Sequence, residues 1–404
     1  MKYKIEYKAS HVDGFQSAGI HCGIKKNNLK DLGLIYCPAP SGVAGVFTQN
    51  VTKAAPVTLS ENHLSQTLPK AILINSGNAN ACTGIQGSVD ALKSAECLAK
   101  QLGINTNEVL VSSTGIIGVP LPMQHLGAGI LKISTTLTNS DFEDVSTAIM
   151  TTDTYSKSVT ATFTIDGREG RITGIAKGSG MIHPNMATML GFMMTDVQID
   201  SDTLQSLLSE TTNKSFNMIS VDGDTSTNDM VLAMASGAKH APKILSQSSK
   251  EQFQEVFHAL SVELAKLIAS DGEGATKLLE MTVKGARSYE DAAKASKSVI
   301  SSSLVKAAFF GKDANWGRII CAMGYSGALF EPDKVDLQLK SENGILQLMK
   351  NGSPLSFNED HALDVLSPDT ILIQANLNDG AYSATAWGCD LTYDYVKING
   401  EYRS

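Results

Sequence analysis

The stretch from Lys177 to Met194 constrains the fold most, because it joins a turn-rich loop to a strand that has to be buried. Residues 177–186 include two glycines, a serine, a proline and an asparagine, which all favour turns. From Met189 to Val197 the chain becomes apolar, which predicts a strand inside the core. Thr188 lies where loop and strand meet, and a threonine there is ordinarily no more than a good β-former.

A second interpretation of Thr188 is that the chain cuts itself directly before this residue. Cleavage between Ala187 and Thr188 would place a hydroxyl group and a free α-amine on the same residue. An α-amine has an unperturbed pKa of roughly 7.7–8, so it can act as the base for its own side chain. Thr188 would then be a nucleophile that carries its own proton acceptor.

The full run of residues favours this second interpretation. Lys-Gly-Ser-Gly-Met-Ile-His-Pro-Asn-Met-Ala-Thr-Met-Leu, over 177–190, resembles the self-processing site of the ornithine acetyltransferase (glutamate N-acetyltransferase) family. The resemblance extends from Gly42-Val-Ala-Gly-Val-Phe47 to Asn399-Gly-Glu-Tyr-Arg-Ser404. It implies self-cleavage into chains 1–187 and 188–404, which form one intertwined unit, and a heterotetramer of two such pairs.

A strand over Glu108–Val111 leads into a loop that holds Thr114 and Gly115. By itself this pattern is a strand that ends at a glycine. The resemblance implies that the two residues form an oxyanion hole. Acyl transfer needs donors aligned on a developing oxyanion. The Thr114 hydroxyl can donate, and Gly115 lets a backbone N–H approach without a Cβ in the way.

The resemblance also implies a set of substrate-binding residues. The ammonium of Lys177 would suit the carboxylate of an amino-acid substrate, although a surface lysine is the plain alternative. The carboxylate of Glu273 would pair with an ornithine or glutamate amine, or else be a solvated side chain after a helix. Spacing does not separate Thr151 from the adjacent Thr152 as a substrate contact. The implied set is Thr151, Lys177, Thr188, Glu273, Asn399 and Ser404, where Ser404 keeps the hydroxyl of the threonine that ends many relatives.

The segment from Asn217 to Asp229 carries three aspartates and several hydroxyl residues. Aspartates at this spacing invite comparison with a cation-binding loop, but the glycine and glutamate of an EF-hand are missing. We interpret the segment as one wall of the active site, and we expect no metal.

Periodicity predicts mixed α+β layers with mixed sheets, and the resemblance implies an ornithine acetyltransferase-like fold of the N-terminal-nucleophile type. Residues 1–70 are predicted to be β-rich with surface loops. The predicted elements after them are helices over 88–102 and 251–269, a hairpin of 159–165 and 171–175 turning at 166–167, and final strands over 371–377 and 385–396.

Composition excludes several other classes of protein. The net charge is −8 and the longest basic run is Lys25-Lys26, which disfavours nucleic acids and anionic membranes as partners. The N-terminus lacks the apolar core of a signal peptide, and no apolar run approaches the ~18–20 residues that span a bilayer. The cysteines show no CxxC pair, which argues against zinc and a disulfide framework and indicates the cytoplasm; they are Cys22, Cys37, Cys82, Cys97, Cys321 and Cys389.

Together these features predict an acetyltransferase of arginine biosynthesis. An acetyl-Thr188 intermediate would carry the acetyl group from N-acetylornithine to glutamate by a ping-pong mechanism that needs no cofactor. Use of acetyl-coenzyme A as a second donor stays open. The rival hypotheses are a related self-cleaving aminopeptidase or amidohydrolase, and a non-enzymatic small-molecule binding protein.

Overall fold

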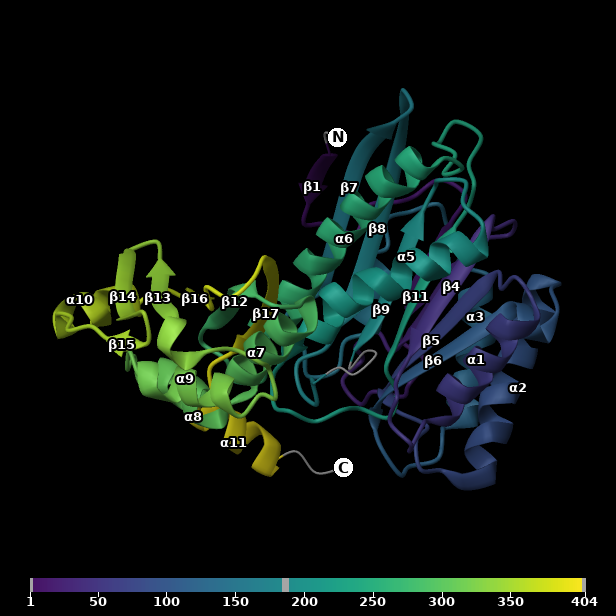
Figure 1. Ribbon diagram of the computed structural model, residues 1–404. Coiled ribbons are helices and arrows are strands. Elements are labelled where there is room, and N and C mark those ends of the chain that lie inside the picture. The colour runs from purple at the N-terminus through teal and green to yellow at the C-terminus, as the bar shows by residue number, and fades with distance from the viewer. Residues whose placement is uncertain (1–2, 184–188, 402–404) are drawn as a thin grey trace.

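The computed structural model describes residues 3–183 and 189–401, and strand β9 (Leu190–Thr195) lies near the middle of it (Figure 1). Every residue of β9 is buried. It pairs antiparallel with β8 (Arg168–Lys177) and parallel with β11 (Met230–Ala235). The predicted buried strand is confirmed, with bounds shorter than 189–197. Ala187 and Thr188 lie outside the described residues.

The six-stranded sheet around β9 has the order β1-β7-β8-β9-β11-β4. Its remaining strands are β1 (Tyr3–Glu6), β4 (Gly42–Phe47) and β7 (Lys157–Ile165). The hairpin β7–β8 turns at Asp166 and Gly167, which both have positive φ angles (51° and 73°). Two positive φ values in a two-residue loop match the twist of the flanking strands. The predicted hairpin is therefore confirmed.

Two helices cover one face of this sheet, α5 (Ser201–Lys214) and α6 (Gln247–Ser270) (Figure 1). Helix α6 begins where the Ser246 hydroxyl accepts a hydrogen bond from the Ser249 N–H. Its buried residues recur at helical spacing and pack against the sheet, as the sequence predicts. They include Phe253, Val256, Phe257, Leu260, Leu264 and Ile268.

A four-stranded sheet packs on the opposite face through a shared apolar core. Its order is β2-β3-β5-β6, with β2 (Gln16–Ile20), β3 (Leu32–Tyr36), β5 (Ala71–Asn78) and β6 (Val109–Ile116). Its outer face is covered by α2 (Gly84–Leu102) and α3 (Met123–Ser134). Helix α4 (Glu143–Ala148) packs against β2 and β3, and the short helix η1 (Thr106–Glu108) precedes β6. The first part of the chain is thus four layers thick, with two sheets between two layers of helices.

Residues 1–70 are predicted to be β-rich with surface loops, and helix α1 (Ala55–Gln66) within them corrects that prediction. Its buried face carries polar residues, which removes the apolar stripe that would reveal a helix. Ser60 donates its hydroxyl proton to the Val111 carbonyl (2.7 Å), and a ring nitrogen of His63 lies 2.8 Å from the Val109 carbonyl. These contacts join α1 to β6.

The C-terminal part is built on a seven-stranded mixed sheet of order β10-β17-β12-β16-β13-β14-β15 (Figure 1). Its strands are β10 (Ile219–Ser220), β12 (Leu278–Ala286), β13 (Asp336–Ser341), β14 (Gly344–Lys350), β15 (Ser353–Pro354), β16 (Thr370–Asn376) and β17 (Tyr382–Cys389). The helices of this part are α7 (Tyr289–Ser301), α8 (Ser303–Phe310), α9 (Trp316–Gly324), α10 (Glu359–Val365) and α11 (Tyr393–Glu401), with short turns η2 (Phe216–Met218) and η3 (Pro332–Lys334).

The predicted strand over 385–396 is wrong in its second half, because the chain turns after Cys389 and forms α11. The Thr392 hydroxyl accepts a hydrogen bond from the Tyr395 N–H (3.2 Å), which caps the new helix. Apart from this difference, the mixed α+β layers and mixed sheets are confirmed. No helix in the described part of the chain is long and apolar enough to span a bilayer.

Candidate active site

A cavity of about 180 Å³ lies beside the start of β9, where the ends of several elements meet. Lining residues come from β6, β8, the loop after α4, the loop before β11, the turn after α6 and helix α11. Those that the sequence singles out are Thr114, Gly115, Thr151, Thr152, Lys177, Glu273 and Asn399. Met189, which follows Thr188 in the chain, lines the same cavity.

Thr114 and Gly115 lie near the end of β6, where its pairing with β5 becomes irregular at Gly77 and Asn78. Gly115 has φ +130°, and a Cβ on it would lie 2.6 Å from the Asn78 nitrogen. Only glycine fits such a close approach of two backbones. The Thr114 side chain is buried next to it. The end of β6 therefore places the Thr114 hydroxyl and the Gly115 backbone, which no Cβ covers, at the cavity.

Asn228 fixes the loop before β11 to this strand end. Its side-chain amide donates to the Ala79 carbonyl (2.5 Å) and the Ser113 carbonyl (2.9 Å). Its own amide oxygen accepts the Thr227 hydroxyl proton (2.6 Å). Because Ser113 directly precedes Thr114, this buried side chain helps to fix the position of the candidate oxyanion pair.

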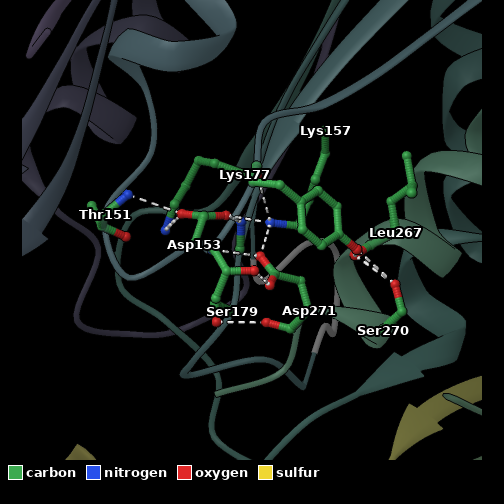
Figure 2. A network of polar contacts seen from close by, with 11 residues as sticks. Thr151, Asp153, Lys157, Lys177, Ser179, Leu267, Ser270 and Asp271 are labelled. Atoms are coloured by element: carbon green, nitrogen blue, oxygen red, sulfur yellow. Dashed lines mark hydrogen bonds and ion pairs between the residues drawn. The ribbon is translucent and has the colours of Figure 1, made fainter. Parts of the chain in front are cut away.

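The carboxylate of Asp153 contacts two residues that line the cavity, Thr151 and Lys177 (Figure 2). One carboxylate oxygen accepts from the Thr151 N–H (2.9 Å), and the other accepts from the Gly178 N–H (2.7 Å). The Lys177 ammonium lies 3.9 Å from the first of these oxygens. Asp153 thus connects the loop after α4 to the end of β8.

Lys157 links Asp153 to Asp271, the residue that ends α6 (Figure 2). Its buried ammonium donates to Asp153 Oδ1 (2.7 Å) and Asp271 Oδ2 (2.5 Å). Burial alone would raise the pKa of Asp153, but the ammonium groups of Lys177 and Lys157 hold that pKa below its usual range. We call Asp153, Lys157 and Asp271 the buried ion network.

Asp271 is connected to Glu273 through hydrogen bonds of Ser179. The Asp271 carbonyl accepts the Ser179 hydroxyl proton (2.6 Å), and the Ser179 carbonyl accepts the Glu273 N–H (3.1 Å). A Cβ on Gly180 would lie 2.5 Å from the Glu273 carboxylate, so the absence of a side chain there lets the carboxylate approach. Asn399 on α11 donates to the same carboxylate (2.8 Å).

Asp229 also lines the cavity and is 3% exposed. Burial raises the pKa of its carboxyl group well above the usual value, against the opposing effects of a Ser226 hydrogen bond and the Lys177 charge. Its Oδ2 atom has no hydrogen-bond partner among the described residues.

The chain matches the ArgJ family over residues 16–404. It belongs to the ArgJ family. Similar curated proteins are Arginine biosynthesis bifunctional protein ArgJ 1 of Clostridium acetobutylicum, 53% identical over 96% of each chain, and ArgJ of Symbiobacterium thermophilum, 51% identical over 97% of each.

Two solved structures are similar to this ArgJ-family chain. ArgJ of Bacillus halodurans is 45% identical, with a TM-score of 0.49, over 52% of this chain and 98% of that chain. Ornithine acetyltransferase of Mycobacterium tuberculosis, complexed with ornithine, is 35% identical, with a TM-score of 0.43, over 46% of this chain and all (100%) of that chain.

The structure gathers most of the site residues that the sequence singles out around one cavity. Thr151 and Thr152 both line it, so the structure does not choose between them. Ala187, Thr188 and Ser404 lie outside the described residues. The segment interpreted as an active-site wall contributes Ser226, Asn228 and Asp229 to the lining.

Sequence reasoning missed the residues that hold this ArgJ-family site together. Asp153 lies inside the Thr151-Thr-Asp-Thr154 run, but Asp271, which accepts from the same Lys157 ammonium, is 118 residues further along the chain. No local pattern reveals such a pair. Asp229 carries a weak local signal, because it is an aspartate followed directly by the apolar strand β11.

Proposed function

We propose that this chain moves the acetyl group of N-acetylornithine to glutamate through an acetyl ester on Thr188. As a member of the ArgJ family it is an acetyltransferase of arginine biosynthesis. The observation that carries the residue-level proposal is the cavity beside Met189. Thr114 and Gly115 at the end of β6, Lys177 and Glu273 all line this cavity together with Met189, the residue that follows Thr188.

Thr114 and Gly115 would stabilise the tetrahedral oxyanion that forms when Thr188 attacks the acetyl carbonyl. Donors fixed in advance on a rigid strand end need no reorganisation during the reaction, and removing one oxyanion donor typically lowers kcat by about 10²–10³. The contact between Gly115 and the β5 backbone supplies that rigidity. The proposed mechanism is then covalent catalysis, in which the acetyl group is transferred first to Thr188 and then to glutamate.

Lys177 and Glu273 supply opposite charges to the same cavity. We propose that Lys177 binds the α-carboxylate of either substrate and that Glu273, with Asn399, binds the ornithine ammonium group. Thr151 is held by Asp153 close to Lys177 and would contact the same end of the substrate. Ser404 would complete the site from the C-terminus.

Scission between Ala187 and Thr188 would leave chains 1–187 and 188–404 intertwined. Strand β9 from the second part pairs with β8 from the first, and β11 from the second part pairs with β4 from the first. Both pieces therefore contribute neighbouring strands to one sheet. We propose that two such pairs assemble into a heterotetramer, which native mass spectrometry can test.

Intact-mass measurement together with a transfer assay tests the proposal. Wild-type protein should give two masses that break at 187/188, and it should convert N-acetylornithine and glutamate into ornithine and N-acetylglutamate. T188A should stay a single chain without transfer, whereas T188S keeps a hydroxyl and should retain both activities in part. Transfer by T188A at the wild-type rate would refute the nucleophile.

The same assay separates related activities. Release of free acetate in place of N-acetylglutamate would indicate hydrolysis, and an intact, inactive wild-type chain would indicate a binding protein. Replacing N-acetylornithine by acetyl-coenzyme A in the assay shows whether the enzyme accepts this second donor.

A further inference from the structure

Asp229 directly precedes β11 and is fixed next to the start of β9 by backbone hydrogen bonds on both sides. Its carbonyl accepts from the Thr48 N–H (3.0 Å), and the N–H of the following Met230 donates to the Met189 carbonyl (3.1 Å). Asp229 therefore lies beside Met189, and Met189 is the residue that directly follows Thr188 in the chain.

The carboxyl group of Asp229 is incompletely bonded. Ser226 contributes a hydrogen bond, but Oδ2 is buried without a partner among the described residues. Leaving a buried polar atom unsatisfied costs about 1–3 kcal/mol. The other charged groups that line the cavity do have partners, since Lys177 faces Asp153 and Glu273 accepts from Asn399. An unpaired oxygen retained at a ligand cavity points to a group on the ligand.

We propose that Asp229 is a catalytic residue that gives a proton to the substrate nitrogen when it leaves the acetyl group and takes a proton from the nitrogen that replaces it. The inference rests on the proposed function. If Lys177 binds the α-carboxylate, the acetylated α-nitrogen lies one carbon away, within the same cavity as Asp229.

The proton transfers balance over the two half-reactions. In the first, the carbon–nitrogen bond of N-acetylornithine breaks and the ester bond to Thr188 Oγ forms. The Thr188 hydroxyl proton passes to the Thr188 α-amine, and the Asp229 proton passes to the departing nitrogen. Ornithine leaves as a neutral amine, which takes up a proton from water.

In the second half-reaction the Asp229 carboxylate takes a proton from the ammonium group of glutamate. The amine attacks the ester, its surplus proton goes to water, and the ester bond to Thr188 breaks. The α-amine returns its proton to Oγ. Asp229 and the α-amine end in the states in which they began.

The surroundings of Asp229 favour the protonated acid that the first half-reaction requires. Burial raises its pKa well above the usual range, and Ser226 and the Lys177 charge oppose this only in part. Lys177 on β8 is itself countered by Asp153. Glu273 lines the same cavity, the Asp222 carboxylate accepts from the N–H groups of the lining residues Met181 and Ile182, and Lys25 lies close enough to Asp153 and Lys177 to interact with their charges. A protonated carboxyl group there is a ready general acid.

Two acetyl donors with different leaving groups test the inference. N-acetylornithine needs a proton on its leaving nitrogen, whereas p-nitrophenyl acetate releases a phenolate that needs none. D229N keeps the size of the side chain but cannot donate an acidic proton. We expect acylation of D229N by N-acetylornithine to fall on the order of 100-fold or more, while acylation by p-nitrophenyl acetate stays within about threefold of wild type.

D196N is the matched control, because Asp196 is another buried aspartate with a raised pKa, about 6, just beyond the far end of β9. It should leave the ratio of the two acylation rates unchanged. Equal losses for both donors in D229N, or no loss for either, would overturn the inference.

Wild-type protein gives a second readout if D229N does not fold or cleave. Acylation by N-acetylornithine should decline as the pH rises through the pKa of Asp229, and acylation by p-nitrophenyl acetate should not decline in that range. Identical pH profiles for the two donors would overturn the inference. Wild-type protein that is not cleaved, or releases no ornithine, would instead refute the proposed function.

Discussion

Removing the Lys157 ammonium is the most direct test of whether the buried ion network holds the proposed substrate-binding residues. In K157M the carboxylates of Asp153 and Asp271 remain buried without the cation that lies 2.7 and 2.5 Å from them. Removing one partner of a buried ion pair costs about 3–5 kcal/mol, because the remaining charge stays desolvated. We expect the free energy of unfolding to fall by about that amount.

K157M should also weaken substrate binding. Asp153 positions the Thr151 backbone and the Lys177 ammonium, and Asp271 positions Glu273 through Ser179. Losing one hydrogen bond to a charged group is worth about 1.5–3 kcal/mol. That loss corresponds to roughly a ten- to 100-fold lower kcat/KM, which should appear mainly as a higher KM for N-acetylornithine.

Urea unfolding and steady-state kinetics measure the two effects, with K306M as the matched control. Lys306 is also buried, but its ammonium donates to the Cys389 carbonyl and lies 3.3 Å from the Cys389 thiol, so no carboxylate loses a partner. K306M should leave KM within about twofold of wild type. If K157M kept the wild-type KM, or lost no more stability than K306M, the network would not be what holds the site.

Three further outcomes follow from the geometry. G115A should lower kcat by about 10²–10³ with little change in KM, because its Cβ would collide with the β5 backbone at the proposed oxyanion pair; steady-state kinetics measures this. G180A should raise the KM for N-acetylornithine, since its Cβ would displace the Glu273 carboxylate, and G127A, with open space around it, is the control. The pKa of Asp153 is lower in the folded protein than in the unfolded chain, where it is about 3.8. The ionised carboxylate therefore stabilises the fold at pH values above about 3.8. That contribution is lost as the pH falls through the lower folded pKa, so thermal midpoints should decline below about pH 4 and D153N should show a smaller decline.

The elements that sequence reasoning predicts correctly are those with a strong local signal. Helix α2 ends at Leu102 and is capped by Gly103, whose φ of +66° is the left-handed conformation that glycine adopts readily. The β7–β8 hairpin has alternating residues and an Asp-Gly turn. Helix α1 has no such signal, because Ser60 and His63 occupy its buried face. Its helical state depends on hydrogen bonds to β6, which the sequence does not display.

The residues of the candidate site likewise fall into those with a local sequence signal and those without one. Thr114, Gly115 and Lys177 stand in runs long enough to be compared with a family, and the fold places them on one cavity. Lys157 lies in an alternating strand where it resembles any solvent-facing lysine, yet it is fully buried. Its hydrogen bonds to Asp153 and to Asp271, which is 114 residues away, identify it as part of the network behind the site.

The buried ion network also bears on how a chain could cut itself without losing its active site. Asp153 and Lys157 precede the proposed scission point, and Asp271 follows it. The bonds of Asp271 to Lys157 and to Thr154 therefore cross the boundary between the two pieces, as does the pairing of β8 with β9. Breaking one peptide bond removes none of these contacts. The position of Thr188 would thus be free to change from an interior residue to a chain start, while Lys177 and Glu273 stay fixed around it.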